Sequence, residues 1–211
     1  MNSSPEVLSG LSFGEELRQQ RWDDHRFYHQ SRVTQSLHLF SALCFLICYV
    51  LLPFKPIAAS LFGWTVAMWS RQIGHFFFEP KGFDQINYVT FEHKEQVKVG
   101  FNLQRKVLLF TAWISVPLLL LLNPELGSLF AKFGGHPFYE RLGIAWLVLG
   151  FVGLFLRTFW LCATRNVQTG LVWFTKILTD PFHDVKIYHM SPIWLLRGQW
   201  FDPMEDVQAS H

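Results

Sequence analysis

The stretch SLHLFSALCFLICYVLL (residues 36–52) decides the fold of this chain, because it contains no Asp, Glu, Lys or Arg over seventeen consecutive residues. At about 1.5 Å per residue, a helix of this length is near the lower limit for crossing a hydrocarbon core about 30 Å thick. The apolar run ends at Pro53 and Pro56, and proline does not continue a helix. We therefore predict a membrane-spanning helix over residues 36–52.

Three further stretches are apolar enough to predict spans, at residues 57–78, 107–122 and 142–162. Half of the 211 residues are hydrophobic and 17% are aromatic, more than is usual in a soluble domain. The sequence predicts an all-α integral membrane protein, a single polytopic domain over residues 1–211 that folds as a four-helix bundle with interfacial helices. Residues 84–106 and the tail from Arg165 are amphipathic and are expected on the membrane surface. The alternative is that some stretches are buried helices of a soluble protein.

The basic residues are unevenly distributed. Four spans would place fifteen of the eighteen Lys and Arg residues on the side of both termini. The positive-inside rule then predicts a multi-pass protein with a cytoplasmic N-terminal arm (1–35) and C-terminal tail (163–211), in a bacterial inner membrane or the endoplasmic reticulum. No cleavable signal peptide is expected, because acidic and basic residues occupy the arm. Basic residues at helix ends against a bilayer do not suit nucleic acid, and the oligomeric state stays open.

Histidine is the residue type that points to chemistry. Eight of the nine histidines map to the predicted cytoplasmic side, and only His136 maps to the other. His75 and Glu79 are four residues apart and share one helix face, one turn after Arg71. Ionisable residues at this depth usually face a protein interior or a wet cavity. The alternative is that His75 and Glu79 pair at the membrane surface and only anchor the helix end.

A second group of polar aromatic residues, Tyr28, His29 and His38, precedes and enters the first span. His29 and His38 are nine residues apart, so on one unbroken helix they would lie about half a turn out of phase. They can meet at one ion only if the chain bends between them, near residues 31–34, or if the ion lies between layers. The alternative is that each histidine is a surface anchor.

A third group, His183, Asp184 and His189, lies in the tail. The two histidines are six residues apart and do not share a helix face, so we interpret the segment as a loop that offers metal ligands or partners to them. The alternative is a solvated loop.

The available side chains restrict the metal. The three cysteines lie in apolar stretches without a CxxC pair, so neither a thiolate site nor a disulfide is expected. Imidazole with carboxylate suits non-haem iron or zinc. One HxxxH pair, His25 to His29, and no HxxHH favour a single ion over a pair. The candidate metal ligands are His29, His38, His75, His183 and His189.

The pattern Tyr28-His29, then His38, then Gln72-Ile73-Gly74-His75 followed by Glu79 resembles the small membrane 2-hydroxy fatty acid dioxygenases first characterised in yeast. The likeness covers residues 22–83. Two departures are Thr34, where the family has Asn, and Pro80 to Phe83, where the family has a stretch containing Pro-Ala-Leu.

The resemblance implies an α-oxidation in which Fe(II) and O₂ cleave the bond between C1 and C2 of a 2-hydroxy fatty acid. It implies His29, His38 and His75 as iron ligands. Glu79 would be a fourth ligand or a partner that orients an imidazole, Arg71 would pair with the substrate carboxylate, and Tyr28 is a further catalytic candidate.

Two other classes of function stay open. One is another membrane lipid enzyme, such as a hydroxylase or a zinc hydrolase. The other is a non-enzymatic scaffold or a transporter, although a transporter is expected to carry polar residues near mid-span and to show repeat symmetry.

Overall fold

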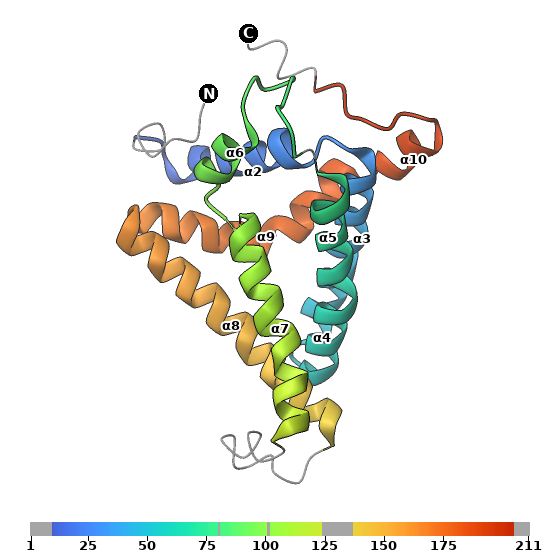
Figure 1. Cartoon of the computed structure of the whole chain (residues 1–211), viewed down its shortest axis with the longest axis vertical. Coiled ribbons are helices and arrows are strands. Elements are labelled where there is room, and N and C mark those ends of the chain that lie inside the picture. Colours follow the sequence, from blue (N-terminus) through green and yellow to red (C-terminus); the bar gives the residue numbers. More distant parts are fainter. Residues whose placement is uncertain (1–9, 80, 101, 124–136, 205–211) are drawn as a thin grey trace.

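The protein is all-helical in the residues described by the computed structural model, 10–79, 81–100, 102–123 and 137–204 (Figure 1). His136, His211 and Pro80 lie outside these residues. The described helical elements are α2 (Phe13–Tyr28), α3 (Arg32–Leu51), α4 (Pro56–Phe62), η1 (Gly63–Ala67), α5 (Met68–Ile73), η2 (Gly74–Phe78), α6 (Phe91–Val97), α7 (Leu103–Leu122), α8 (Phe138–Thr164), α9 (Val167–Tyr188) and α10 (Ser191–Leu196).

Three helices, α3, α7 and α8, are long and apolar enough to cross a membrane. They correspond to the predicted spans over residues 36–52, 107–122 and 142–162, and each begins four residues before the predicted start. The difference arises because a helix begins directly after its N-cap residue, whereas each predicted span began at the first residue of an uncharged run. Ser31 and Asn102 cap α3 and α7 with side-chain hydrogen bonds, so charged side chains occupy the first helical turn.

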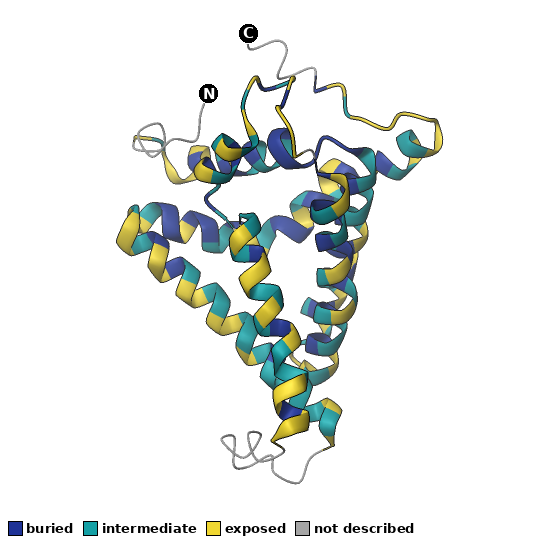
Figure 2. Cartoon of the chain, viewed as in Figure 1, coloured by how far each residue is buried: buried dark blue, intermediate teal, exposed yellow. Residues whose placement is uncertain are grey.

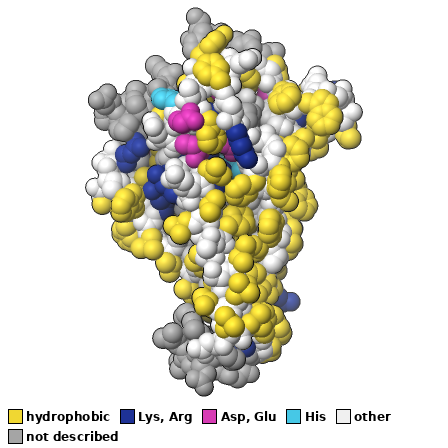
Figure 3. All heavy atoms as spheres, viewed as in Figure 1, with side chains coloured by type: hydrophobic (Ala, Val, Ile, Leu, Met, Phe, Trp, Pro, Cys, Tyr) yellow, Lys and Arg dark blue, Asp and Glu magenta, His cyan; other side chains and the backbone are white. Residues whose placement is uncertain are grey.

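Large apolar side chains point outward along these helices. Leu108 and Leu122 of α7 are 71% and 84% exposed, and Phe159 of α8 is 66% exposed. In Figures 2 and 3 exposed and hydrophobic side chains follow the length of the molecule, while charged side chains gather toward its broad end. An apolar surface of this extent requires an apolar surrounding, which supports membrane association.

Residues 57–78 do not form the single regular span that the sequence predicts. They are divided into α4, η1, α5 and η2, and the two η elements are π-helical turns that begin at Gly63 and Gly74. The helical backbone continues without interruption from Pro56 to Phe78, but the π-helical turns divide it into pieces too short to count as a span, so the expected four-helix bundle is not established. Short π-helical turns often occur at functional sites, and η2 carries His75.

The helices converge at one end and spread at the other (Figure 1). α3, α7 and α8 run toward the narrow end, where α4 packs against α8, and α9 crosses the broad end in contact with both α3 and α8. α2 and α6 lie at the same end (Figure 1), where α2 packs on α9. Of the expected surface helix over residues 84–106, only α6 is a separate helix, because residues from Leu103 on already belong to α7.

The prediction of a loop around His183 is wrong, because α9 is helical through Tyr188 despite Pro181 in its interior. A proline removes one backbone N–H, and side-chain interactions along the helix compensate here. Lys176 and Asp180 form an ion pair four residues apart, 2.7 Å between nitrogen and oxygen.

Candidate metal centre

Three histidines from three elements meet at the broad end of the molecule. One potential ligand atom from each of His29, His38 and His75 lies within 4.8 Å of the others. The ring centroids are 4.0 Å apart for His29 and His38, 4.9 Å for His38 and His75, and 5.3 Å for His29 and His75. Nitrogens bound tetrahedrally to one ion by bonds of about 2.1 Å lie about 3.4 Å apart, so the three imidazoles must move inward by roughly 1 Å to bind one metal.

The bend that the spacing of His29 and His38 requires is present. α2 ends at Tyr28, His29 is its C-cap, and α3 begins at Arg32 after Ser31, whose side chain accepts a hydrogen bond from the Val33 N–H. The break lies at residues 29–31, slightly before the predicted position. It turns two histidines nine residues apart toward the same point.

The buried imidazole nitrogens provide a test of whether a metal fits. His29 Nε2 and both ring nitrogens of His38 are buried and have no hydrogen-bond partner among the described residues. Buried polar atoms normally find a partner, and one left without it costs about 1–3 kcal/mol. A cation between the three rings would satisfy His29 Nε2 and one ring nitrogen of His38, so the residues present fit a metal ion.

A different side chain backs each imidazole on the side away from the common point. His75 Nδ1 lies 2.8 Å from Glu79 Oε2, and His38 Nδ1 lies 3.7 Å from Asp184 Oδ2. His29 Nδ1 lies 2.8 Å from the Tyr188 hydroxyl. Metal-binding histidines usually engage such a partner through the second ring nitrogen, which fixes the ring and its tautomer. This leaves an Nε2 atom of each ring for the ion.

Tyr188 connects His29 to a further histidine, His25. Its hydroxyl also lies 3.1 Å from His25 Nδ1, and His25 Nε2 lies 3.9 Å from Asp202. Burial, with the nearby Asp184 charge, raises the pKa of Tyr188, so its hydroxyl stays protonated. Burial, with the adjacent His38, holds the pKa of His29 well below its usual value, so His29 is a neutral ligand at neutral pH. His29 Nδ1–H then donates to Tyr188, which donates to His25.

Replacing Tyr188 by phenylalanine is expected to weaken metal affinity about 10- to 100-fold, because partners of this kind contribute that much at other metal sites. Competition against a metal-chelating dye measures the change. Tyr49→Phe is the matched control, since the Tyr49 hydroxyl donates to the Leu178 carbonyl away from the histidines. Equal affinities of Tyr188→Phe and the control would show that Tyr188 does not orient His29.

The three predicted catalytic residues lie in different surroundings. Glu79 is beside His75, and its Oε2 atom is also 3.7 Å from Lys106 Nζ. Arg71 is near the histidines but is paired with Asp184, at 3.0 Å. Tyr28 points elsewhere, because its hydroxyl donates to the Lys94 carbonyl at 2.6 Å.

The other two predicted ligands, His183 and His189, do not join the group of three. His183 is half-buried on α9. His189 is exposed, and its Nδ1 atom lies 2.9 Å from the Lys186 carbonyl. The positions of these two histidines follow from the helical path of this segment, which directs other side chains of α9 to the site.

The side chains that the sequence reasoning missed form a stripe on α9. Lys176, Asp180, Asp184 and Tyr188 recur every four residues and are 7%, 5%, 5% and 1% exposed. The spacing of four was the available signal, since such residues share one helix face. The prediction missed this spacing because Pro181, inside the segment, favours a loop over a helix.

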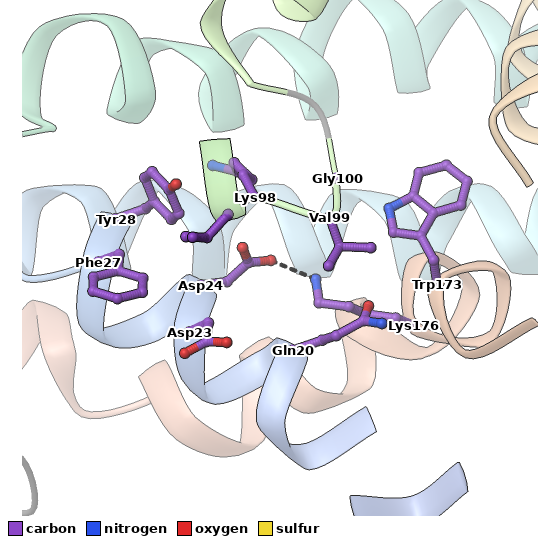
Figure 4. A pocket seen from close by; sticks show the side chains of 11 residues that line it. Gln20, Asp23, Asp24, Phe27, Tyr28, Lys98, Val99, Gly100, Trp173 and Lys176 are labelled. Atoms are coloured by element: carbon purple, nitrogen blue, oxygen red, sulfur yellow. Dashed lines mark hydrogen bonds and ion pairs between the residues drawn. The ribbon is translucent and has the colours of Figure 1, made fainter. Parts of the chain in front are cut away.

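The first half of this stripe forms an ion cluster with α2. Lys176 Nζ lies 2.6 Å from Asp24 and 2.7 Å from Asp180, and Figure 4 shows Lys176 meeting Asp24 beside Lys98 and Trp173. Burial opposes the Asp24 charge, but Lys176 and Lys98 outweigh it and hold the pKa of Asp24 below its usual range. This cluster joins α2 to α9 and so stabilises the wall behind the histidines.

A half-open cavity of about 380 Å³ begins at the histidines. Arg71, Lys98, Lys106 and Lys176 line its polar end, and mainly apolar residues of α3, α4, η1, α7 and α8 line the rest. Its volume is within the range of small-molecule sites. A reacting group beside the three histidines could therefore carry a long apolar substituent.

Comparison of the chain with protein-family models, curated proteins and solved structures finds no match. The chemistry of the site must therefore be inferred from its own residues.

Proposed function

We propose that this protein is a multi-pass membrane dioxygenase that uses Fe(II) and O₂ to cleave the bond between C1 and C2 of a 2-hydroxy fatty acid. The observation that supports the proposal most is the group of three buried histidines at the mouth of an apolar cavity. The reaction balances as R–CH(OH)–COOH + O₂ → R–COOH + CO₂ + H₂O. O₂ accepts the four electrons that the substrate loses.

The side chains around the cavity suit such a substrate. His29, His38 and His75 would hold the iron, which when bound activates O₂ beside the chelating hydroxyl and carboxyl oxygens. Glu79 and Tyr188 would keep two of the imidazoles oriented. Arg71 would attract the substrate carboxylate, although its pairing with Asp184 means that the two anions share one guanidinium.

The proposed topology has four passages of the membrane, with the broken helix α4 to η2 as the second. α2, α6 and α9 would then lie at the cytoplasmic interface with both termini. Fifteen of the eighteen Lys and Arg residues would lie on this side of the membrane, which supports this orientation. The substrate would enter from the bilayer, with its head at the interface and its chain in the apolar cavity.

A zinc hydrolase is the second candidate, because three histidines with no carboxylate among them also form a zinc site. The two candidates differ in their requirement for O₂ and in the metal that supports turnover.

The purified protein loaded with Fe(II) is expected to convert a 2-hydroxy fatty acid to the acid one carbon shorter under air but not under nitrogen. The same fatty acid without its hydroxyl group is the control and should remain unchanged. Mass spectrometry of the products measures both. A shortened product formed under nitrogen, or no product with Fe(II) under air, would contradict the dioxygenase, and O₂-independent hydrolysis with Zn²⁺ would favour the alternative.

A further inference from the structure

Three tryptophans, of which Trp64 and Trp146 line the cavity, form a floor beneath part of its apolar region. Trp64 Nε1 donates to the Trp146 carbonyl at 2.9 Å, and Trp146 Nε1 donates to the Trp113 carbonyl at 3.1 Å. The rings of Trp113 and Trp146 stack at 5.4 Å, and Trp64 stacks on Trp113 at 6.4 Å. These bonds join η1, α7 and α8, so the floor does not yield easily to a ligand.

Two glycines of α8, Gly150 and Gly153, lie in the wall above this floor. Trp146, Gly150 and Gly153 line the cavity and follow the spacing of one helix face. A Cβ atom added at Gly150 would lie 3.7 Å from the Trp64 ring, whereas one added at Gly153 would meet no atom within 4 Å. Gly153 thus borders open space one turn above the tryptophan floor.

The size of the cavity limits what it holds. A cavity of about 150 Å³ accommodates the six carbons of benzene, so about 380 Å³ corresponds to roughly fifteen carbon atoms. The cavity therefore has room for one acyl chain. At the polar end Arg71, Lys98, Lys106 and Lys176 offer cationic partners to an anionic head group, which would share them with the carboxylates already paired there, Asp184, Glu79, Asp24 and Asp180.

We propose that the cavity selects single-chain anionic lipids by the length of their chain. The head group lies beside Lys106 and the histidines, and the tail ends on Trp64. Gly153 leaves the space for the last carbons. The inference deepens, and for its substrate class rests on, the proposed function. It assigns to Gly153 a role in substrate specificity. A side chain at position 153 would lean toward the preceding turn of α8, into the space above Trp64.

The test is binding of saturated fatty acids from decanoate to octadecanoate to chelator-treated, metal-free protein, measured by displacement of a fluorescent fatty acid. Each buried methylene contributes about fourfold in affinity. A leucine side chain introduced at Gly153 closes about one helical turn of depth, or roughly three to four carbons of extended chain. Gly153→Leu is therefore expected to bind the longest acids on the order of 100-fold more weakly and the shortest acids unchanged.

Val152→Leu is the matched control, because Val152 is the adjacent residue of α8 and is 46% exposed on its outer face. It should follow the wild-type chain-length profile. An equal loss for all chain lengths in Gly153→Leu, the same shift in Val152→Leu, or no binding of any fatty acid to the wild type would overturn the proposal.

The readout is independent of the proposed reaction, since metal-free protein is used. A shifted profile in a protein without O₂-dependent turnover would contradict the dioxygenase and support the chain-length site. Turnover with an unshifted profile would support the dioxygenase and contradict the chain-length site.

Discussion

Replacing His38 by alanine is expected to abolish stoichiometric metal binding. His38 is fully buried between the other two imidazoles, and its loss leaves two of three ligands and an empty volume at the centre of the site. Because substitution of an outer partner already costs about 10- to 100-fold, loss of a direct ligand should cost more than about 100-fold in affinity. Metal analysis of detergent-purified protein after dialysis against Fe(II) or Zn²⁺ measures the effect.

The matched control is His189→Ala, because His189 is an exposed histidine outside the group of three. This variant should retain about the metal content of the wild type. Equal metal content in His38→Ala and His189→Ala would contradict the assignment. Thermal unfolding of both variants without metal separates loss of a ligand from loss of the fold.

Replacing Lys176 by methionine is expected to destabilise the protein by about 1.5–3 kcal/mol, the usual contribution of a hydrogen bond to a charged group. Lys176 is 7% exposed and is the cation that Asp24 and Asp180 share. Methionine preserves most of the side-chain volume, so the loss reflects Asp24, which loses its hydrogen-bond partner, while Asp180 keeps Arg21 at 3.1 Å. Thermal unfolding in detergent measures the change.

The control for this variant is Lys186→Met, which removes an exposed lysine from the same helix. It should leave the unfolding temperature nearly unchanged, and equal unfolding temperatures for the two variants would contradict the role of the cluster.

The sign of the pH dependence of stability follows from Asp24. Its pKa is lowered in the folded protein, so its contribution is present above the ordinary carboxyl pKa and is lost as the pH falls below it.

The long helices could be predicted from the sequence, because an uncharged run such as residues 36–52 has few alternatives to a helix in contact with lipid. The meeting of His29, His38 and His75 was an expectation that depended on a bend, and the bend lies at the cap of α3. Here local chemistry was sufficient, since Ser31 is a favourable helix cap.

The sequence was less informative where long-range contacts determine the structure. The π-helical turns at Gly63 and Gly74 follow no periodicity that composition reveals. At Gly74 an added Cβ would lie 3.2 Å from Thr34, so packing against α3 sets the local path. Tyr188 joins His29 from 159 residues away, and no local pattern connects them.

The central claim is that one ion is held by three imidazoles, and X-ray absorption spectroscopy of the Fe(II)-loaded protein tests it most directly. We expect three imidazole nitrogens at about 2.1 Å from the metal in the wild type, and two in His75→Ala if that variant retains any metal. A metal bound through oxygen ligands alone, or an unchanged spectrum in His75→Ala, would contradict the account.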